Sequence, residues 1–286
     1  MSESKQTQYA DVESWELSDS IWERIEPLMP TPKSRYRGRG SRRRHIGGRP
    51  AADARKTMSG ILYVLRTGCQ WNAAPKEYGS GKTLHRYFQR WVKVGLFQRM
   101  WQVGLMEYDH TKGIAWTWQA ADGTMTKAPL GGEKTGPNPT DRAKTGTKRS
   151  VLVDQHGVPL GIVVSGANTP DAQLLEPTLA ALAVEPPDPE DTPQNLCLDK
   201  AYCGEPCQRV AQAYGYELHV PDKANAKQPR KRKPGRRKPR RWVVEVTHSW
   251  INRFRRLLVR WEKKASNYLS LLCFACAIIC WRKCEV

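Results

Sequence analysis

Apolar residues in the first third of the chain recur at the spacing of amphipathic helices. From residue 17 to residue 110 they repeat every three or four positions, which places their side chains on one face of a helix. Ser18 or Ser20 is suited to cap the first, short helix, and Gly68 to end the second. The predicted longer helices cover about 51–67, 81–94 and 97–108.

Basic side chains accompany the helix predicted over 81–94. Lys82, Arg86 and Arg90 lie mostly away from its apolar face. Three short helices with basic outward residues are typical of a helix-turn-helix-like DNA-binding domain, here over 17–110 with a basic loop over 33–50. A helical dimerisation or packing domain with a solvated face explains the same pattern equally well.

A different periodicity begins at residue 114. Short apolar runs alternate with turns and helical stretches, and two runs joined by the letters QHG predict a β-hairpin. This order of elements predicts a mixed α/β domain over 114–286. The expected elements are strands over 114–122, 151–154 and 159–165, a helix over 171–182, a strand over 195–199, a helix over 205–214, a strand over 216–220 and a long helix over 242–264.

Two of these predicted strands end on an aspartate. Asp122 closes the first strand and Asp199 the fourth. Sites in open α/β sheets form outside the carboxyl ends of strands. A single aspartate at such an end is more often a cap or a loop hydrogen bonder. Asp141, Asp154 and Asp171 are expected to be structural: a loop residue, a turn residue and a first-turn helix residue, respectively.

A third carboxylate, Glu245, lies near the start of the helix predicted over 242–264. At about 100° per residue, the predicted core face consists of Val243, Val246, Thr247, Trp250, Phe254, Leu257 and Trp261. Residues within about 60° of Glu245 are His248, Ser249, Asn252 and Arg256. Glu245 therefore heads a polar stripe that faces either solvent or an active-site cleft. A solvated face is the commoner case, but the strongly basic surroundings favour a cleft that binds a cation beside phosphate.

Three carboxylates from two strand ends and one helix suit Mg²⁺, a hard cation that prefers oxygen ligands. Two such ions about 4 Å apart can activate an attacking oxygen and stabilise a leaving one. This is the chemistry of phosphodiester cleavage and transfer.

Composition adds a strong and localised positive charge. The 286 residues carry a net charge of +19, and two segments account for all of it: +9 over 32–56 and +10 over 222–241. Concentrated blocks in a balanced chain indicate sites for a polyanion, and arginine forks onto phosphate well. The candidate phosphate contacts in these blocks are Arg35, Arg37, Arg42, Arg43, Arg44, Lys231, Arg232, Arg236, Arg237 and Arg241.

The remaining composition favours a cytoplasmic protein without a membrane span. The polar segment 1–16 is expected to be disordered and resembles no signal peptide. The longest apolar stretch, 268–281, is shorter than the roughly 20 residues that a span needs. Its cysteines could be a metal cluster or part of a buried helix, and their single stripe among apolar residues favours the helix. They are Cys273, Cys276, Cys280 and Cys284.

Several motifs, taken in order, resemble the bacterial insertion-sequence DDE transposases of the insertion-sequence-five group, within the four/five superfamily. The N-terminal motifs are LSDSIWERIEPLMP, ILYVLRTGCQW and TLHRYFQRWVKVGLF. The C-terminal ones are AADGT, GPNPTDRAKTGTKRSVLVDQHGVPLGIVVSGANTPDA, LDKAY and RWVVEVTHSWINRFRRLLVRWEKKASNYLSL. Each is a modest signal alone, whereas their order and spacing over nearly the whole chain are highly specific.

The resemblance implies an RNase H-like fold with Asp122, Asp199 and Glu245 as catalytic acids that bind two Mg²⁺ or Mn²⁺ ions. It places the family's Arg-three-residues-Glu signature at Arg241 and Glu245, and its later basic or amide position at Asn252. The family usually has arginine directly after the catalytic glutamate, where this chain has Val246. Implied partners are double-stranded DNA, as terminal inverted repeats and target, and a second copy of the chain in the DNA complex.

Three functions remain compatible with the residues. The first is a transposase, in which basic helices and loops, together with Arg253, Arg255 and Arg256, contact phosphates while the acids cut and join DNA. The second is a non-catalytic DNA-binding protein or decayed transposase, which would need no cluster of acids. The third, ranked well behind, is an RNA-processing nuclease of the same fold.

Overall fold

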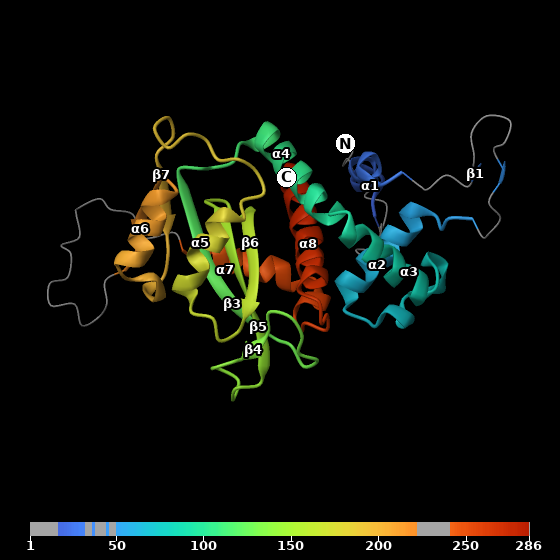
Figure 1. The fold of residues 1–286 in the computed structure, drawn as a ribbon. Coiled ribbons are helices and arrows are strands. Elements are labelled where there is room, and N and C mark those ends of the chain that lie inside the picture. The colour runs from blue at the N-terminus through green and yellow to red at the C-terminus, as the bar shows by residue number, and fades with distance from the viewer. Residues whose placement is uncertain (1–16, 32–35, 38–43, 46–49, 222–240, 286) are drawn as a thin grey trace, which may run out of the picture. The chain divides into compact units, whose positions relative to one another are not determined.

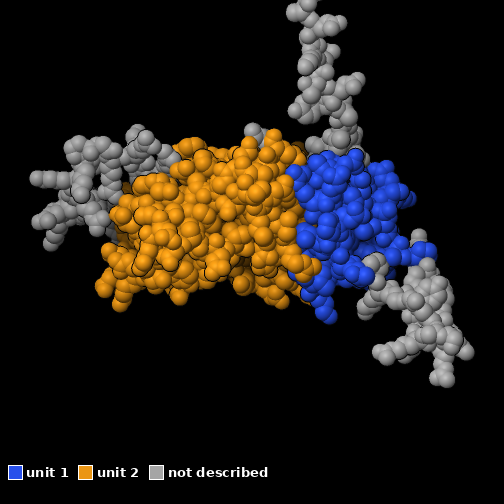
Figure 2. All heavy atoms as spheres, turned by 90° about the horizontal axis from the view of Figure 1, so that it is seen from above, with its two compact units in different colours: residues 1–96 blue, residues 97–286 orange. Residues whose placement is uncertain are grey.

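A computed structural model describes residues 17–31, 36–37, 44–45, 50–221 and 241–285 (Figure 1). The chain divides into two compact units, residues 1–96 and 97–286, which Figure 2 distinguishes by colour. The segment 1–16, expected to be disordered, and most of both basic segments lie outside the described residues. Within the first basic segment, β1 (Tyr36–Arg37) pairs antiparallel with β2 (Arg44–His45), so it is not wholly the loop that we predicted.

The first unit contains the three short helices predicted before residue 95. They are α1 (Asp19–Ile25), α2 (Ala54–Thr67) and α3 (Gly81–Lys93), with 3₁₀ turns over Glu26–Leu28, Trp71–Ala73 and Lys76–Tyr78. The side chains of Ser18, Asp53 and Ser80 accept hydrogen bonds from backbone N–H groups in the first turns of these helices. Gly68 ends α2 with a φ of 74°, which suits glycine.

The amphipathic faces of α2 and α3 meet in the core of this unit. Val64 and Leu84 belong to one buried cluster with Tyr78. Gly60 allows the close approach, because a Cβ there would overlap Tyr78 and Leu84. The apolar periodicity therefore predicted both the helices and the faces that they bury.

The expected domain boundary differs from the structure at α4 (Leu96–Lys112). We placed this helix in the N-terminal domain, whereas all but its first residue falls in the second unit. Its apolar side chains pack there: the rings of Phe97 and Phe274 lie 5.3 Å apart, and the Trp101 indole donates to the Pro159 carbonyl over 3.0 Å. The sequence pattern predicted that this segment is a helix. It did not predict the domain, because the residues that α4 packs against lie far along the chain.

The second unit is built on a mixed sheet. The strand order is β4–β5–β3–β7–β8, with β6 also paired to β5. β3 and β6 each pair antiparallel with β5, whereas β7 pairs parallel with both β3 and β8. The strands are β3 (Trp118–Lys127), β4 (Gly136–Pro137), β5 (Thr145–Asp154), β6 (Pro159–Gly166), β7 (Gln194–Cys197) and β8 (Tyr216–His219).

Helices cover both faces of this sheet, as Figure 1 shows. The helices α5 (Asp171–Ala180) and α6 (Glu205–Ala213) pack on one side, while α7 (Trp242–Asn252) and α8 (Ala265–Glu285) pack on the other. The alternation along β5 explains this: Ser150 bonds to Thr178 of α5, and Arg149 bonds to Asn252 of α7. The predicted mixed α/β class with flanking helices is confirmed.

Three predicted elements have wrong boundaries, and one is the strand predicted over 151–154, which is β5 and begins at Thr145. The first strand does not end at Asp122, because β3 continues to Lys127 along its long ladder with β5. The helix predicted over 242–264 ends at Asn252 and is followed by a 3₁₀ turn, Arg255–Leu257. The chain then leaves helical geometry, since the Arg260 N–H bonds to the Lys127 carbonyl at the sheet over 2.8 Å. Trp261, predicted in the core, is 42% exposed.

The cysteine stripe lies on α8, a central helix of the second unit. Cys273, Cys276 and Cys280 are buried, and burial raises the pKa of each thiol. The burial of these three side chains on one helix agrees with the buried-helix interpretation. Among the described residues, α8 alone is long and apolar enough to cross a membrane. Most of its apolar stretch, 78%, is buried inside the protein.

Candidate active site

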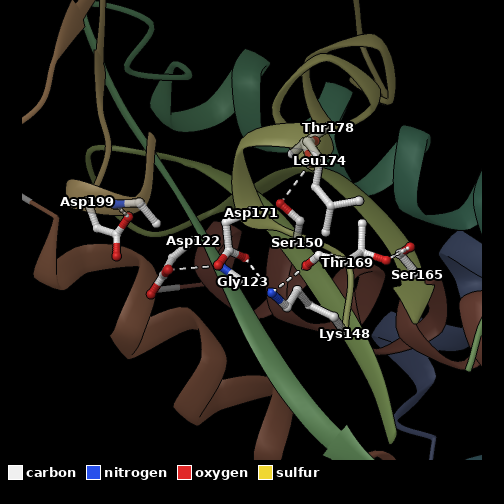
Figure 3. A network of polar contacts seen from close by, with 11 residues as sticks. Asp122, Gly123, Lys148, Ser150, Ser165, Thr169, Asp171, Leu174, Thr178 and Asp199 are labelled. Carbon is white, nitrogen blue, oxygen red and sulfur yellow. Dashed lines mark hydrogen bonds and ion pairs between the residues drawn. The ribbon is translucent and has the colours of Figure 1, made fainter. Parts of the chain in front are cut away.

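The register of two parallel strands brings Asp122 and Asp199 to the same level of the sheet. Ala120 of β3 pairs with Cys197 of β7. Two residues further along the chain lie Asp122, still within β3, and Asp199, just past the end of β7, and Figure 3 shows their carboxylates as neighbours. Because β7 ends at Cys197, Asp199 leaves the ladder and caps the next turn, accepting a 2.8 Å bond from the Ala201 N–H.

Asp122 is the more enclosed of the two acids. Its Oδ1 accepts a 2.8 Å hydrogen bond from the N–H of Gly123. Burial raises the pKa of Asp122 to about 6, despite this hydrogen bond. The carboxylates of Asp199 and Asp171 raise it further, while the guanidinium of Arg241 opposes them. The side chain is therefore placed where a nearby cation would stabilise its charged form.

Glu245 approaches this edge from α7, one turn after Arg241. The Arg241 guanidinium lies 3.7 Å from Asp199 Oδ2 through Nη1, and 3.4 Å from Glu245 Oε1 through Nη2. One cation thus contacts two of the three predicted acids and acts electrostatically on the third.

The chemistry of these side chains fits a hard divalent cation. All three offer carboxylate oxygens, which Mg²⁺ and Mn²⁺ accept. Within the described part of the chain, no three acids or other metal-ligating side chains are arranged closely enough to hold an ion as they stand. The guanidinium of Arg241 instead neutralises Asp199 and Glu245, so binding of an ion would require this side chain to move.

The face of α7 that packs on the sheet differs from the predicted one. Its buried residues are Val243, Val244, Thr247, His248 and Ile251. The core face is therefore rotated toward His248, and Val246 and Trp250 are only half-buried. Glu245 still lies outside it, with a side chain that is 56% exposed.

His248 is a buried neutral imidazole, not part of an exposed polar stripe. Burial lowers its pKa to about 3, and the positive charge of Arg149 lowers it further. The backbone of Asp122 faces the ring and counters a small part of this effect. Neither ring nitrogen has a hydrogen-bond partner among the described residues. His248 thus packs directly behind the strand that carries Asp122.

Two residues predicted to contact DNA instead form hydrogen bonds or ion pairs within the protein. Asn252 Oδ1 accepts a 2.6 Å hydrogen bond from the buried guanidinium of Arg149. Arg256 is 7% exposed and donates from Nε and Nη2 to Glu262 Oε1, at 2.9 and 2.8 Å. The prediction for Arg256 is wrong, because the helix on which it rested ends four residues earlier. For Asn252 the structure shows a role in holding α7 on the sheet.

The basic side chains predicted on α3 are exposed. Lys82, Arg86 and Arg90 all point away from the core of the first unit. The guanidinium carbons of Arg86 and Arg90 lie 5.7 and 5.1 Å from the centre of the Tyr87 ring. Predicted contacts outside the described residues are Arg35, Arg42, Arg43, Lys231, Arg232, Arg236 and Arg237, while Arg37 and Arg44 are described only as part of the β1–β2 ladder.

Sequence reasoning missed a polar cluster behind Asp122. Lys148 Nζ lies 3.0 Å from Asp171 Oδ1, and the pair packs against Gly123 (Figure 3). Asp171 was predicted to be a first-turn helix residue, and it does begin α5. The signals available were the glycine after Asp122 and the charged residues inside the predicted hairpin region.

Comparisons with known proteins identify the family of the chain. A family described as "Transposase DDE domain" matches residues 119–280, and one described as "Putative transposase of IS4/5 family" matches residues 17–101. The first of these implies the RNase H-like fold that the resemblance predicted.

Individual relatives come from two bacteria. A Burkholderia cepacia protein named "Putative transposase for insertion sequence element IS402" is 37% identical over 157 residues, or 53% of this chain and 70% of the relative. A second Burkholderia cepacia protein, "Insertion element IS402 uncharacterized 16.2 kDa protein", is 33% identical over 125 residues, or 43% of this chain and 80% of the relative. "Uncharacterized protein y4sN" of Sinorhizobium fredii is 26% identical over 112 residues, or 39% of this chain and 76% of the relative. Since the DDE-domain match covers more than half of the chain, the chain belongs to the DDE transposase family, among insertion-sequence transposases of the IS4/5 group.

Proposed function

We propose that the protein cuts DNA at the ends of its own insertion sequence and joins the freed 3′-hydroxyls to target DNA. The observation that supports this most directly is that Arg241 contacts both Asp199 and Glu245, at 3.7 and 3.4 Å, and acts electrostatically on Asp122. The family acts on DNA and generally uses divalent metal ions. The finer assignment to these three acids rests on their geometry.

In this proposal the three carboxylates hold two Mg²⁺ or Mn²⁺ ions beside the scissile phosphate. Ions bound there would activate the attacking oxygen and stabilise the leaving one. Asp122 and Asp199 are fixed by their strands and by backbone N–H groups. Glu245 is set by the packing of α7. Arg241 would exchange its contacts with Asp199 and Glu245 for DNA phosphate.

Basic residues would bring the DNA to this edge. Those of segment 222–241 lead directly into α7, so phosphates bound by them would lie beside the acids. Lys82, Arg86 and Arg90, with the basic loop over 33–50, would hold the inverted-repeat ends. Two ends must be held together for joining, so we propose a homodimer in the DNA complex, acting in the bacterial cytoplasm on the nucleoid.

A non-catalytic DNA-binding protein is the second candidate, favoured by Val246. Where the family usually has arginine, this side chain is apolar and half-buried, and it has no donor that could bind a phosphate. Both candidates bind DNA with a strong dependence on salt, because phosphate contacts release counterions. Only the first requires the acids.

Cleavage of a duplex that carries the ends of the element tests the proposal. The parent protein should nick this duplex with Mg²⁺ or Mn²⁺ and not with a chelator. Asp199→Asn should lose cleavage by at least a hundredfold while binding the duplex within about threefold of the parent. Asp191→Asn, an exposed loop acid of the same unit, is the control and should cleave normally. Equal cleavage by Asp199→Asn and the parent would exclude the site assignment.

A further inference from the structure

Lys148 and Asp171 form an enclosed ion pair between the sheet and α5. Lys148 Nζ lies 3.0 Å from Asp171 Oδ1 and donates to the Thr169 carbonyl over 2.8 Å. The Lys148 side chain is 7% exposed and that of Asp171 is 26% exposed. A buried ammonium needs such partners, because an uncompensated charge in the interior is strongly destabilising. The pair therefore fixes the Asp171 carboxylate in one place.

That place is directly against Gly123. A Cβ on residue 123 would overlap the Asp171 carboxylate oxygen Oδ1 and would approach Lys148 Cδ to 3.3 Å. The backbone φ of Gly123 is one that any residue adopts, so glycine is not required for its conformation. Glycine is required because the absence of a side chain leaves room for Asp171. The carboxylate of Asp171 thus fills the position that a side chain would otherwise occupy on β3.

The same glycine orients Asp122. Its N–H donates to Asp122 Oδ1 over 2.8 Å. The contacts therefore run without a gap from Lys148 through Asp171 and Gly123 to Asp122, and Figure 3 shows these residues side by side. Asp171 blocks movement of Gly123 toward the start of α5.

We propose that Asp171, held by Lys148, is a positioning residue for Asp122 and acts by supporting the Gly123 peptide that orients the Asp122 carboxylate. The inference rests on the proposed role of Asp122 in binding divalent ions. It gives Asp171 a task beyond starting α5, and it explains why glycine follows Asp122. Asp171 itself makes no contact with metal or substrate in this role.

A double-mutant cycle separates support by Asp171 from a merely structural ion pair. Gly123→Ala adds a methyl group that collides with the Asp171 carboxylate, and because Lys148 holds this carboxylate, the proposal requires the peptide to shift. Lys148→Met with Asp171→Ala removes both charges together, which leaves no uncompensated ammonium, and also removes the atom that the methyl group meets. Gly123→Ala is then made in the parent and in this double variant.

Binding of Mn²⁺ to each protein without DNA, measured by calorimetry and by electron paramagnetic resonance, is the readout. We expect Gly123→Ala to weaken Mn²⁺ binding at least tenfold in the parent and less than twofold in the double variant. A ratio of these two losses of at least fivefold supports the proposal. A smaller ratio overturns it, because the methyl group then acts independently of Asp171. Circular dichroism and melting curves establish that each protein is folded.

Asp171→Asn supplies a second test if a cycle member does not fold. Its matched control is Asp141→Asn, since Asp141 is also 26% exposed and pairs with a lysine, Lys127, at 3.4 Å. Lys127 is five residues beyond Asp122 on β3, or about 17 Å along the strand. The proposal requires Asp171→Asn to bind Mn²⁺ at least fivefold more weakly than Asp141→Asn, and a smaller difference overturns it.

Failure of the proposed function would look different. If the parent and Asp199→Asn bind Mn²⁺ equally, the acids are not the metal site, whatever the cycle shows. If Asp199→Asn loses binding but the cycle is additive, the metal site stands and only the role of Asp171 is excluded.

Discussion

The guanidinium of Arg149 donates a 2.6 Å hydrogen bond from Nη2 to Oδ1 of Asn252. Arg149 is fully buried, and its Nε and Nη1 have no hydrogen-bond partner among the described residues. Asn252 closes α7 and lies 103 residues along the chain from Arg149. The bond ties the last turn of the helix that carries Glu245 to β5, the strand beside Asp122.

Asn252→Ala should therefore reduce stability more than DNA binding. Loss of an acceptor from a buried charged donor costs about 1–3 kcal/mol, and we expect the free energy of unfolding, measured in urea, to fall by about 2 kcal/mol. DNA affinity at a fixed salt concentration should stay within about twofold, with an unchanged salt dependence.

Arg253→Ala is the control, because the side chain of Arg253 is exposed. If it contacts a phosphate, its loss should reduce the salt slope by about 1 with little effect on stability. The opposite result, weaker DNA binding by Asn252→Ala without loss of stability, would show that Asn252 leaves Arg149 to contact DNA.

The buried ion pair of Arg256 and Glu262 allows a second test of whether a side chain predicted to contact DNA instead stabilises the fold. Both side chains are nearly buried, at 8% and 5% exposure. Arg256→Ala should lower the free energy of unfolding by about 3–5 kcal/mol, because Glu262 is left as an uncompensated buried charge. Arg256→Met combined with Glu262→Leu should recover most of this loss, since neither charge remains. Equal instability of the single and double variants would show that packing, and not charge, dominates at this pair.

Arg149 and Arg256 also show which features cannot be predicted from the sequence. The cap Ser18, the helix end at Gly68 and the QHG hairpin are local features, so they predicted the start of α1, the end of α2 and the β5–β6 hairpin from short stretches of sequence. Arg149 and Arg256 are polar residues that the fold buries against partners elsewhere in the chain. Helical periodicity treats such residues as outward-facing, and it therefore extended α7 too far and rotated its core face.

The candidate acids were predictable to different degrees. Asp199 follows a short apolar strand and could be located from the sequence alone. Asp122 was predicted to end a strand, whereas β3 continues past it for five residues. Those residues, GTMTK, are mostly polar, and their ladder with the buried polar residues of β5 is not visible in the apolar pattern. The support from Asp171 depends on contacts between three elements and has no local signature.

Arg241 should compete with divalent ions for Asp199 and Glu245. Arg241→Gln removes the guanidinium that lies 3.7 and 3.4 Å from these acids. Because the groups are partly exposed and screened by solvent, we expect a modest gain in Mn²⁺ affinity without DNA, about threefold to tenfold. Binding to DNA should weaken, since a phosphate contact is lost.

The chain offers a matched control for this substitution. Arg209 and Glu205 form another i,i+4 pair, 4.0 Å apart, on α6 of the same unit. Arg209→Gln should leave Mn²⁺ affinity unchanged. Weaker Mn²⁺ binding by Arg241→Gln would mean that Arg241 orders the acids for the metal and does not compete with it.

His248 should make the folded protein sensitive to acid. Its pKa is lowered from 6.5 to about 3 in the folded state, so between these pH values the unfolded chain binds more protons than the folded one. The contribution of His248 to the free energy of unfolding is therefore fully present above about pH 6.5. It declines as pH falls toward 3, by up to about 1.4 kcal/mol per pH unit for one such group. His248→Gln cannot bind this proton, so its free energy of unfolding should fall less steeply below pH 6.5 than that of the parent. His156→Gln, at an exposed turn, should keep the parent slope. Identical slopes for the parent and His248→Gln in urea unfolding between pH 4 and 6.5 would show that the folded protein accepts a proton at His248, and that the contact of this ring with β3 opens readily enough to admit water beside Asp122.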